Sequence, residues 1–199
     1  MLKLGTTNIS LPFSKAYLGS VLKYQKIVNT EFTACPFPTS WTEVVEGLEY
    51  TATNDYGTWR IWSDTCYSAS SNVSYAFDND TTVANHFSPT ALASDEKSYM
   101  GIDLPSGVTI NPTQIYLSAT YIGSTSENAA IEGLNENGEW QVVTEITRRG
   151  GSSREETISI SSNNFYSKFR LKMIRFTVSS SRPRIQEFQI RSGTIREEK

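Results

Sequence analysis

The sequence predicts an all-β protein, a sandwich or barrel of short strands, and three observations support this. Aromatic residues make up 12% of the 199 residues, and Ser, Thr and Gly are frequent where a helical protein would have long Ala, Leu, Glu and Lys runs. Seven stretches after residue 98 alternate apolar and polar side chains, the period of a half-buried strand. The pair Asn137-Gly138 lies between two of them and favours a hairpin with a type I′ turn.

Taken in order, the chain divides into an arm, a linker, a sandwich domain and a tail. Residues 1–30 form the arm, in which apolar runs separated by Gly predict brief strands. Pro36 and Pro38 break any helix, so residues 31–47 are expected to be a linker. The sandwich is expected over 48–192, followed by a charged tail at 193–199. The alternating stretches predict strands at 99–104, 113–122, 129–134, 140–146, 156–161, 168–178 and 184–192.

Composition and charge argue against several classes of partner. The formal net charge of -3 disfavours nucleic-acid binding, because neutralising phosphates needs clustered Lys and Arg. No apolar run approaches the length of a membrane span, and the first residues lack the continuous apolar stretch of a secretory signal. We therefore expect no nucleic-acid partner and no membrane partner.

Residues suited to catalysis are scarce. Cys35 and Cys66 have no metal-ligand spacing and are too few for a disulfide framework, so free or buried thiols are the simpler interpretation. The sequence has 1 His, no Gly-x-Ser-x-Gly motif and no phosphate-binding loop. Only carboxylates remain for acid–base chemistry, and no motif singles out a pair of them. We expect no enzymatic activity.

Several segments occur in an order and spacing typical of one known family. They are SYAFDNDTTVANHF at 74–87, SYMGIDLPSGVTINPTQIYLS at 98–118, IEGLNENGEW at 131–140, and FYSKFRLKMI with RPRIQEFQI between 165 and 190. These segments resemble the discoidin domain, also called the coagulation-factor C-type or galactose-binding-like domain. The resemblance covers about residues 48–192 and implies a jelly-roll β-sandwich of eight strands.

The resemblance also implies a structural cation, with calcium the expected ion. In the family, an Asp-rich turn and a Glu near the C-terminus often supply its oxygen ligands. Asp78, Asp80 and Glu187 match these carboxylates. The alternative is that Asp78-Asn79-Asp80 is only an Asx-type turn, in which the first side chain bonds the backbone two residues later.

Sugar-binding members of the family carry an aromatic platform and His, Arg or Asn side chains on loops at one end of the sandwich. The matching candidates for a carbohydrate site are Trp59, Arg60, Trp62, Asn85 and His86. A structural alternative remains, because the alternation in TWRIW at 58–62 equally predicts that the two Trp side chains pack in the core or at an interface.

The arm contains Leu-Gly-Thr at 4–6 and Leu-Gly-Ser at 18–20. Such units are similar to the N-terminal segments of virion proteins of tailed bacteriophages, notably crAss-like and other phages of Bacteroidetes, where they precede discoidin-like domains. The resemblance implies an arm that docks on another virion protein by adding strand edges. The anchor residues would be Leu4, Gly5, Tyr17, Leu18 and Gly19.

Together these resemblances predict a non-enzymatic structural protein located in the virion, such as a head-fibre, capsid-decoration or tail-appendage subunit. The alternative is an adhesion module that binds host-surface or mucosal glycans. A dimer or trimer is also expected, because 4 Trp, 10 Tyr and 9 Phe exceed what one sandwich core takes in. Against this, the arm and linker could cover the surplus aromatic side chains within one chain.

Overall fold

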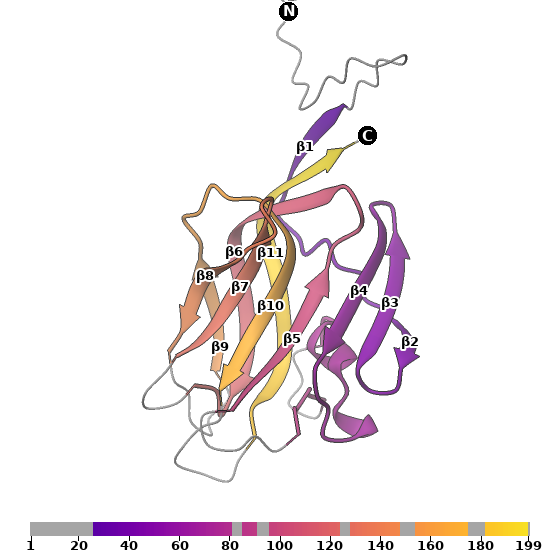
Figure 1. The fold of residues 1–199 in the computed structure, drawn as a ribbon, viewed down its shortest axis with the longest axis vertical. Helices are drawn as coiled ribbons and strands as arrows, with labels where there is room; N and C mark the ends of the chain where they lie inside the picture. The colour runs from indigo at the N-terminus through magenta and orange to yellow at the C-terminus, as the bar shows by residue number, and fades with distance from the viewer. Residues whose placement is uncertain are drawn as a thin grey trace, which may run out of the picture.

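The computed structural model describes residues 26–80, 85–90, 96–123, 128–147, 154–174 and 182–198, and these are mostly β-strand (Figure 1). The first four strands are β1 (Ile27–Phe32), β2 (Thr42–Val45), β3 (Glu49–Asn54) and β4 (Gly57–Ser63). Two 3₁₀ turns follow, η1 (Ala69–Ser71) and η2 (Val73–Ala76). The remaining strands are β5 (Lys97–Asp103), β6 (Val108–Thr120), β7 (Ala129–Asn135), β8 (Trp140–Ile146), β9 (Arg154–Ser159), β10 (Tyr166–Ile174) and β11 (Arg184–Glu198). No helix in the described ranges is long and apolar enough to span a membrane.

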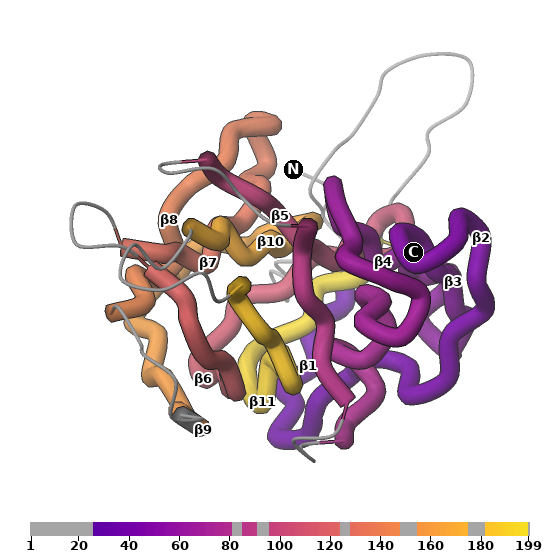
Figure 2. The backbone as a smooth tube through the Cα atoms, turned by 90° about the horizontal axis from the view of Figure 1, so that it is seen from below, coloured from indigo at the N-terminus to yellow at the C-terminus, as the bar shows by residue number. Residues whose placement is uncertain are grey.

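The strands form two antiparallel layers that face each other (Figure 2). One layer has the order β2-β3-β4-β5-β10-β7-β8, and the other has the order β1-β11-β6-β9. A single pairing between Tyr166 in β10 and Ile110 in β6 connects them. The chain is thus an all-β protein with the discoidin-like jelly-roll sandwich that the sequence predicts.

The core lies between the two layers and follows the alternation in the sequence. Along β4, Trp59 and Ile61 are buried, while Arg60 and Trp62, which alternate with them, are partly exposed. The same two-residue period brings the other strands' apolar side chains inward. The fully buried members include Met100, Ile102, Ile110, Ile115, Leu117, Phe169 and Phe188.

The predicted hairpin at Asn137-Gly138 is present between β7 and β8. Gly138 has a φ of 79°, and its N–H donates to the Asn135 carbonyl at 3.0 Å. Asn137 is not among the described residues of positive φ, so this is not the expected type I′ turn, which needs two such residues. A longer connection with Gly alone in the left-handed region closes the hairpin instead.

The domain limits differ from those expected at both ends. Residues 193–198, expected in a tail, continue β11 and pair with β1, in the register Phe32 to Gly193 and Ile27 to Glu198. The alternation continues into this segment, and Ile195 is fully buried. Residues 27–32 and 193–198 therefore form one β-ribbon that projects from the sandwich (Figure 1).

The expected linker contributes to the core as well. Phe37 is only 8% exposed, and its ring lies 5.6 Å from that of Trp59 and 6.2 Å from that of Phe77, measured between centroids. In the described ranges Tyr67 is the only exposed large aromatic side chain. The linker thus covers aromatic surface within one chain, and association into a dimer or trimer stays a prediction.

Candidate functional site

Three loop segments meet at the end of the sandwich opposite the β1–β11 ribbon. The Tyr67 N–H donates to the Ser88 carbonyl at 2.9 Å, and the buried Ser88 hydroxyl donates to the Pro183 carbonyl at 3.0 Å. Phe87 and Ile185 exchange two backbone hydrogen bonds of 2.8 and 2.9 Å. These bonds fix the segments around residues 67, 87 and 183 relative to one another and to the start of β11.

Tyr67 provides an aromatic ring at this end and is 51% exposed. The Arg182 guanidinium carbon lies 3.6 Å from the centre of the Tyr67 ring, in the range of a cation–π contact. The Nε atom of Arg182 is buried and has no hydrogen-bond partner among the described residues. A fixed aromatic ring beside a guanidinium group is an arrangement suited to a ligand with an apolar face and hydroxyl groups.

Asn85 and His86, two of the residues predicted from the sequence, lie in the same loop region and are half-buried. Burial lowers the pKa of His86, and the charge of the neighbouring Arg184 lowers it further. A neutral imidazole has one donor and one acceptor nitrogen, so His86 can bond a hydroxyl group in either direction. Arg184 also lies 5.9 Å from the centre of the Tyr121 ring, which adds a second aromatic residue nearby.

The other three predicted carbohydrate residues do not join this group. Trp59 is completely buried and donates its indole N–H to Asn54 at 2.8 Å, so it cannot contact a ligand. This is the core packing that its alternation also allowed. Arg60 and Trp62 face outward and share a partner: Arg60 contacts Asp103 at 3.1 Å, and the Trp62 indole N–H donates to the same carboxylate at 3.0 Å.

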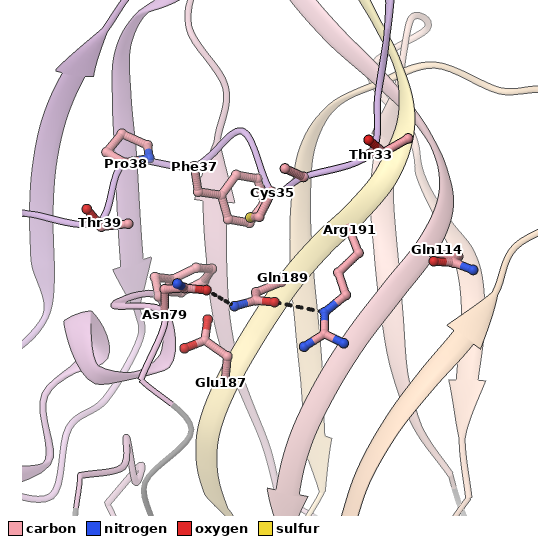
Figure 3. A pocket seen from close by; sticks show the side chains of 12 residues that line it. Thr33, Cys35, Phe37, Pro38, Thr39, Asn79, Gln114, Glu187, Gln189 and Arg191 are labelled. Carbon is pink, nitrogen blue, oxygen red and sulfur yellow. Dashed lines mark hydrogen bonds between the residues drawn. The ribbon is translucent and has the colours of Figure 1, made fainter.

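One predicted cation residue, Glu187, lines a second region, a pocket of about 380 Å³ against β11, and Asn79 from the turn between Asp78 and Asp80 lines it too (Figure 3). Gln189 lies across this pocket, where its amide donates to the Asn79 side chain and accepts from Arg191 Nε at 3.0 Å. Glu187 is 1% exposed, and its Oε2 has no hydrogen-bond partner in the described part of the chain. Burial and then the charge of Asp78 raise the pKa of Glu187 to about 9.

The residues of this region supply only part of the oxygen ligands that a calcium ion needs. The Asp80 N–H donates to Asp78 Oδ1 at 2.9 Å, which is the Asx-type turn considered as the alternative. Within the described ranges, no three His, Cys, Asp or Glu side chains gather as a metal site would require. Glu187 and Asp78 are the two carboxylates that could hold an ion, and the remaining oxygen ligands would have to be carbonyl groups or water. Calcium stays a prediction.

Comparison with known proteins supports the fold. No protein-family model and no curated protein matches the sequence. Among solved structures, the family 32 carbohydrate-binding module of NanJ from C. perfringens, in complex with galactose, has a TM-score of 0.52 at 12% identity. The match covers 74% of this chain and 99% of that one. The two proteins share a fold.

Two further structures are similar at slightly lower TM-scores. CBM62 from Clostridium thermocellum Xyl5A gives 0.49 at 15% identity, covering 83% of this chain and 98% of that chain. A chitosan-binding module from the Paenibacillus sp. IK-5 chitosanase/glucanase gives 0.49 at 16% identity, covering 65% and 91%.

The predicted virion anchor residues lie outside the described residues, so the virion assignment stays a prediction. They are Leu4, Gly5, Tyr17, Leu18 and Gly19. At the loop end, sequence reasoning missed Tyr67, Arg182 and Arg184. Their place depends on contacts between segments more than 90 residues apart, and no local pattern marks them.

Proposed function

We propose that this chain is a non-catalytic carbohydrate-binding module, and that it binds glycans at the loop end formed by Tyr67, Asn85, His86, Arg182 and Arg184. This is the alternative function that the sequence left open, in preference to a purely structural virion role. The observation that carries the proposal is the exposed Tyr67 ring, held by Arg182 at 3.6 Å and bonded through its backbone to the loop that contains the half-buried His86.

The chemistry of this end matches that of a sugar. The apolar face of a pyranose ring stacks on an aromatic side chain, and its hydroxyl groups bond to neutral His, Asn and Arg side chains. The shared fold with a carbohydrate-binding module whose structure contains galactose supports a glycan ligand. Galactose is therefore the first probe to use.

The test is isothermal titration calorimetry of the full chain with galactose and lactose, followed by a panel of host-surface and mucin-type glycans. We expect binding that is weakened at least tenfold by Tyr67→Ala and by His86→Ala. Val142→Ala serves as the control, because Val142 is 55% exposed on β8, away from this end. Binding that both loop-end variants leave unchanged, or no binding to any glycan in the panel, would contradict the proposal.

A further inference from the structure

A second pocket lies at the end of the sandwich from which the β1–β11 ribbon projects. It has a volume of about 330 Å³ and is formed by the β7–β8 turn, the segment before β10 and the end of β11. Arg196 lies in it, while Arg184 at the start of the same strand belongs to the loop end. At about 3.3 Å per residue, twelve residues of strand separate the two regions by roughly 40 Å.

Amide side chains dominate the lining of this pocket. They are Asn135, Asn137, Gln141, Asn163 and Asn164. An amide side chain offers one carbonyl acceptor and two N–H donors. A sugar hydroxyl group can donate a hydrogen bond to the first and accept one from the second. The side chains of Asn137 and Asn163 make no hydrogen bond to any other described residue, so their full capacity is open to a ligand.

Two of the amides are held in place by neighbours. The Asn164 amide donates to Gln141 Oε1 at 3.2 Å. Asn135 Oδ1 accepts the N–H groups of Asn137 and Glu139, both at 2.9 Å, and so fixes the turn that carries Asn137. Part of the lining is therefore positioned before any ligand arrives, which lowers the entropy cost of binding.

Arg196 provides the second, independent observation. Its guanidinium lies 3.6 Å from the centre of the Phe165 ring, and its Nη1 donates to Glu136 at 2.6 Å. Its Nε is buried and has no partner among the described residues. The ring and the Glu136 carboxylate therefore hold the guanidinium in place at the edge of the pocket.

We propose that this pocket is a second carbohydrate subsite, which binds a neutral mono- or disaccharide through the amides, the Phe165 ring and the Arg196 guanidinium. The charge of Arg196 is balanced by Glu136 in the same pocket, and the other polar lining groups are uncharged. A neutral polyhydroxylated ligand matches this balance, whereas an acidic or amino sugar would leave a charge uncompensated. The volume is at the lower end for ligand sites, about 300–1,000 Å³, and suits one or two sugar rings.

The experiment is an NMR titration of the ¹⁵N-labelled full chain with galactose, glucose, mannose and N-acetylglucosamine in parallel. We expect at least one of them to shift the amide signals of 135–141 and 163–165 at millimolar concentration. The double variant Asn137→Ala/Asn163→Ala should weaken that response at least tenfold. Asn128→Ala is the matched control, because Asn128 is an exposed amide bonded to Glu145, outside the pocket.

The two ends are distinguished by the Tyr67→Ala variant. This change is expected to weaken binding at the loop end at least tenfold and to leave the shifts at 135–141 unchanged, so the test of each site is independent of the other. The subsite is refuted if none of the four sugars moves these signals, or if the double variant binds like the wild type. Tighter binding of glucuronate or glucosamine than of their neutral counterparts would refute the preference for a neutral ligand.

Discussion

Glu187 is buried beside Asp78, and no described residue bonds to its Oε2 atom. Both carboxyl groups have raised pKa values, chiefly because burial disfavours their charged forms. Backbone N–H groups of Asn79 and Asp80 and the Gln189 side chain offset part of this effect on Glu187. Loss of the Glu187 proton is therefore disfavoured in the folded chain, and a cation held between the two carboxyl groups would favour it instead.

The first prediction concerns pH in the presence of chelator. The pKa of Glu187 is about 9 in the folded chain, against 4.5 as the reference, so the folded state keeps a proton that the unfolded state has lost. The contribution of Glu187 to the free energy of unfolding should then be highest below pH 4.5. It should fall as pH rises toward 9. One retained proton corresponds to at most about 1.4 kcal/mol per pH unit.

Urea denaturation between pH 5 and 8 measures this slope. In Glu187→Gln the slope should shrink, and the variant should be more stable than the wild type at pH 8. Asp55→Asn, which removes an exposed carboxyl on the β3–β4 turn, is the control and should leave the slope unchanged. A wild-type slope that survives Glu187→Gln would show that other groups set the pH dependence.

A second prediction follows if calcium occupies this site. An ion that binds only the folded state raises the melting temperature by mass action, and it favours the ionised form of Glu187. Calcium should therefore raise the melting temperature at pH 7 relative to chelator and flatten the pH dependence. Glu187→Gln should show neither response. Identical melting curves for the wild type in calcium and in chelator would leave Asp78-Asn79-Asp80 as an Asx-type turn only.

The sequence predicted the strands better than their partners. Residues 140–146 form β8 with the predicted bounds, because alternation is a local signal. Residues 193–198 were assigned to a tail, because their partner β1 is more than 160 residues away and nothing local marks the pairing. The alternation around Trp59 showed two faces of a strand but not which of them is buried.

For the candidate site, too, the sequence indicated the residues that carry a local pattern but not those brought in by long-range contacts. Asn85 and His86 follow a turn with a family-like pattern, so the resemblance named them as candidates. Tyr67 and Arg182 belong to no motif, and they lie together where Ser88 bonds both of their segments. A site assembled from three loops is determined by tertiary contacts, which alternation and turn chemistry do not encode.

The third prediction is that Phe37 is a core residue despite its place between two prolines. Its ring packs on Trp59, Phe77 and Phe188, at centroid distances of 5.6, 6.2 and 6.4 Å. Phe37→Ala should lower the free energy of unfolding by about 3 kcal/mol, as deletion of a buried phenyl ring does. Chemical denaturation checks this, with Val142→Ala as an exposed control that should change stability by less than about 0.5 kcal/mol. If Phe37→Ala lowered the free energy of unfolding as little as the control does, residues 31–47 would be a linker that does not contribute to the core.

The last prediction concerns two positions that require glycine for different reasons, a close backbone contact at Gly193 and a positive φ at Gly138. A Cβ at Gly193 would lie 2.2 Å from the Asn111 carbonyl oxygen, so Gly193→Ala requires the β6 backbone to move and should cost about 3 kcal/mol. A Cβ at Gly138 would meet nothing within 4 Å, but φ is 79°, so Gly138→Ala should cost only about 1 kcal/mol of backbone strain. Asn tolerates this conformation better than Ala, so Gly138→Asn should recover part of the loss, whereas Gly193→Asn should be no better than Gly193→Ala. Urea denaturation of the four variants measures the order. Equal losses for the two alanine variants would mean that the β11–β6 contact at Gly193 relaxes freely.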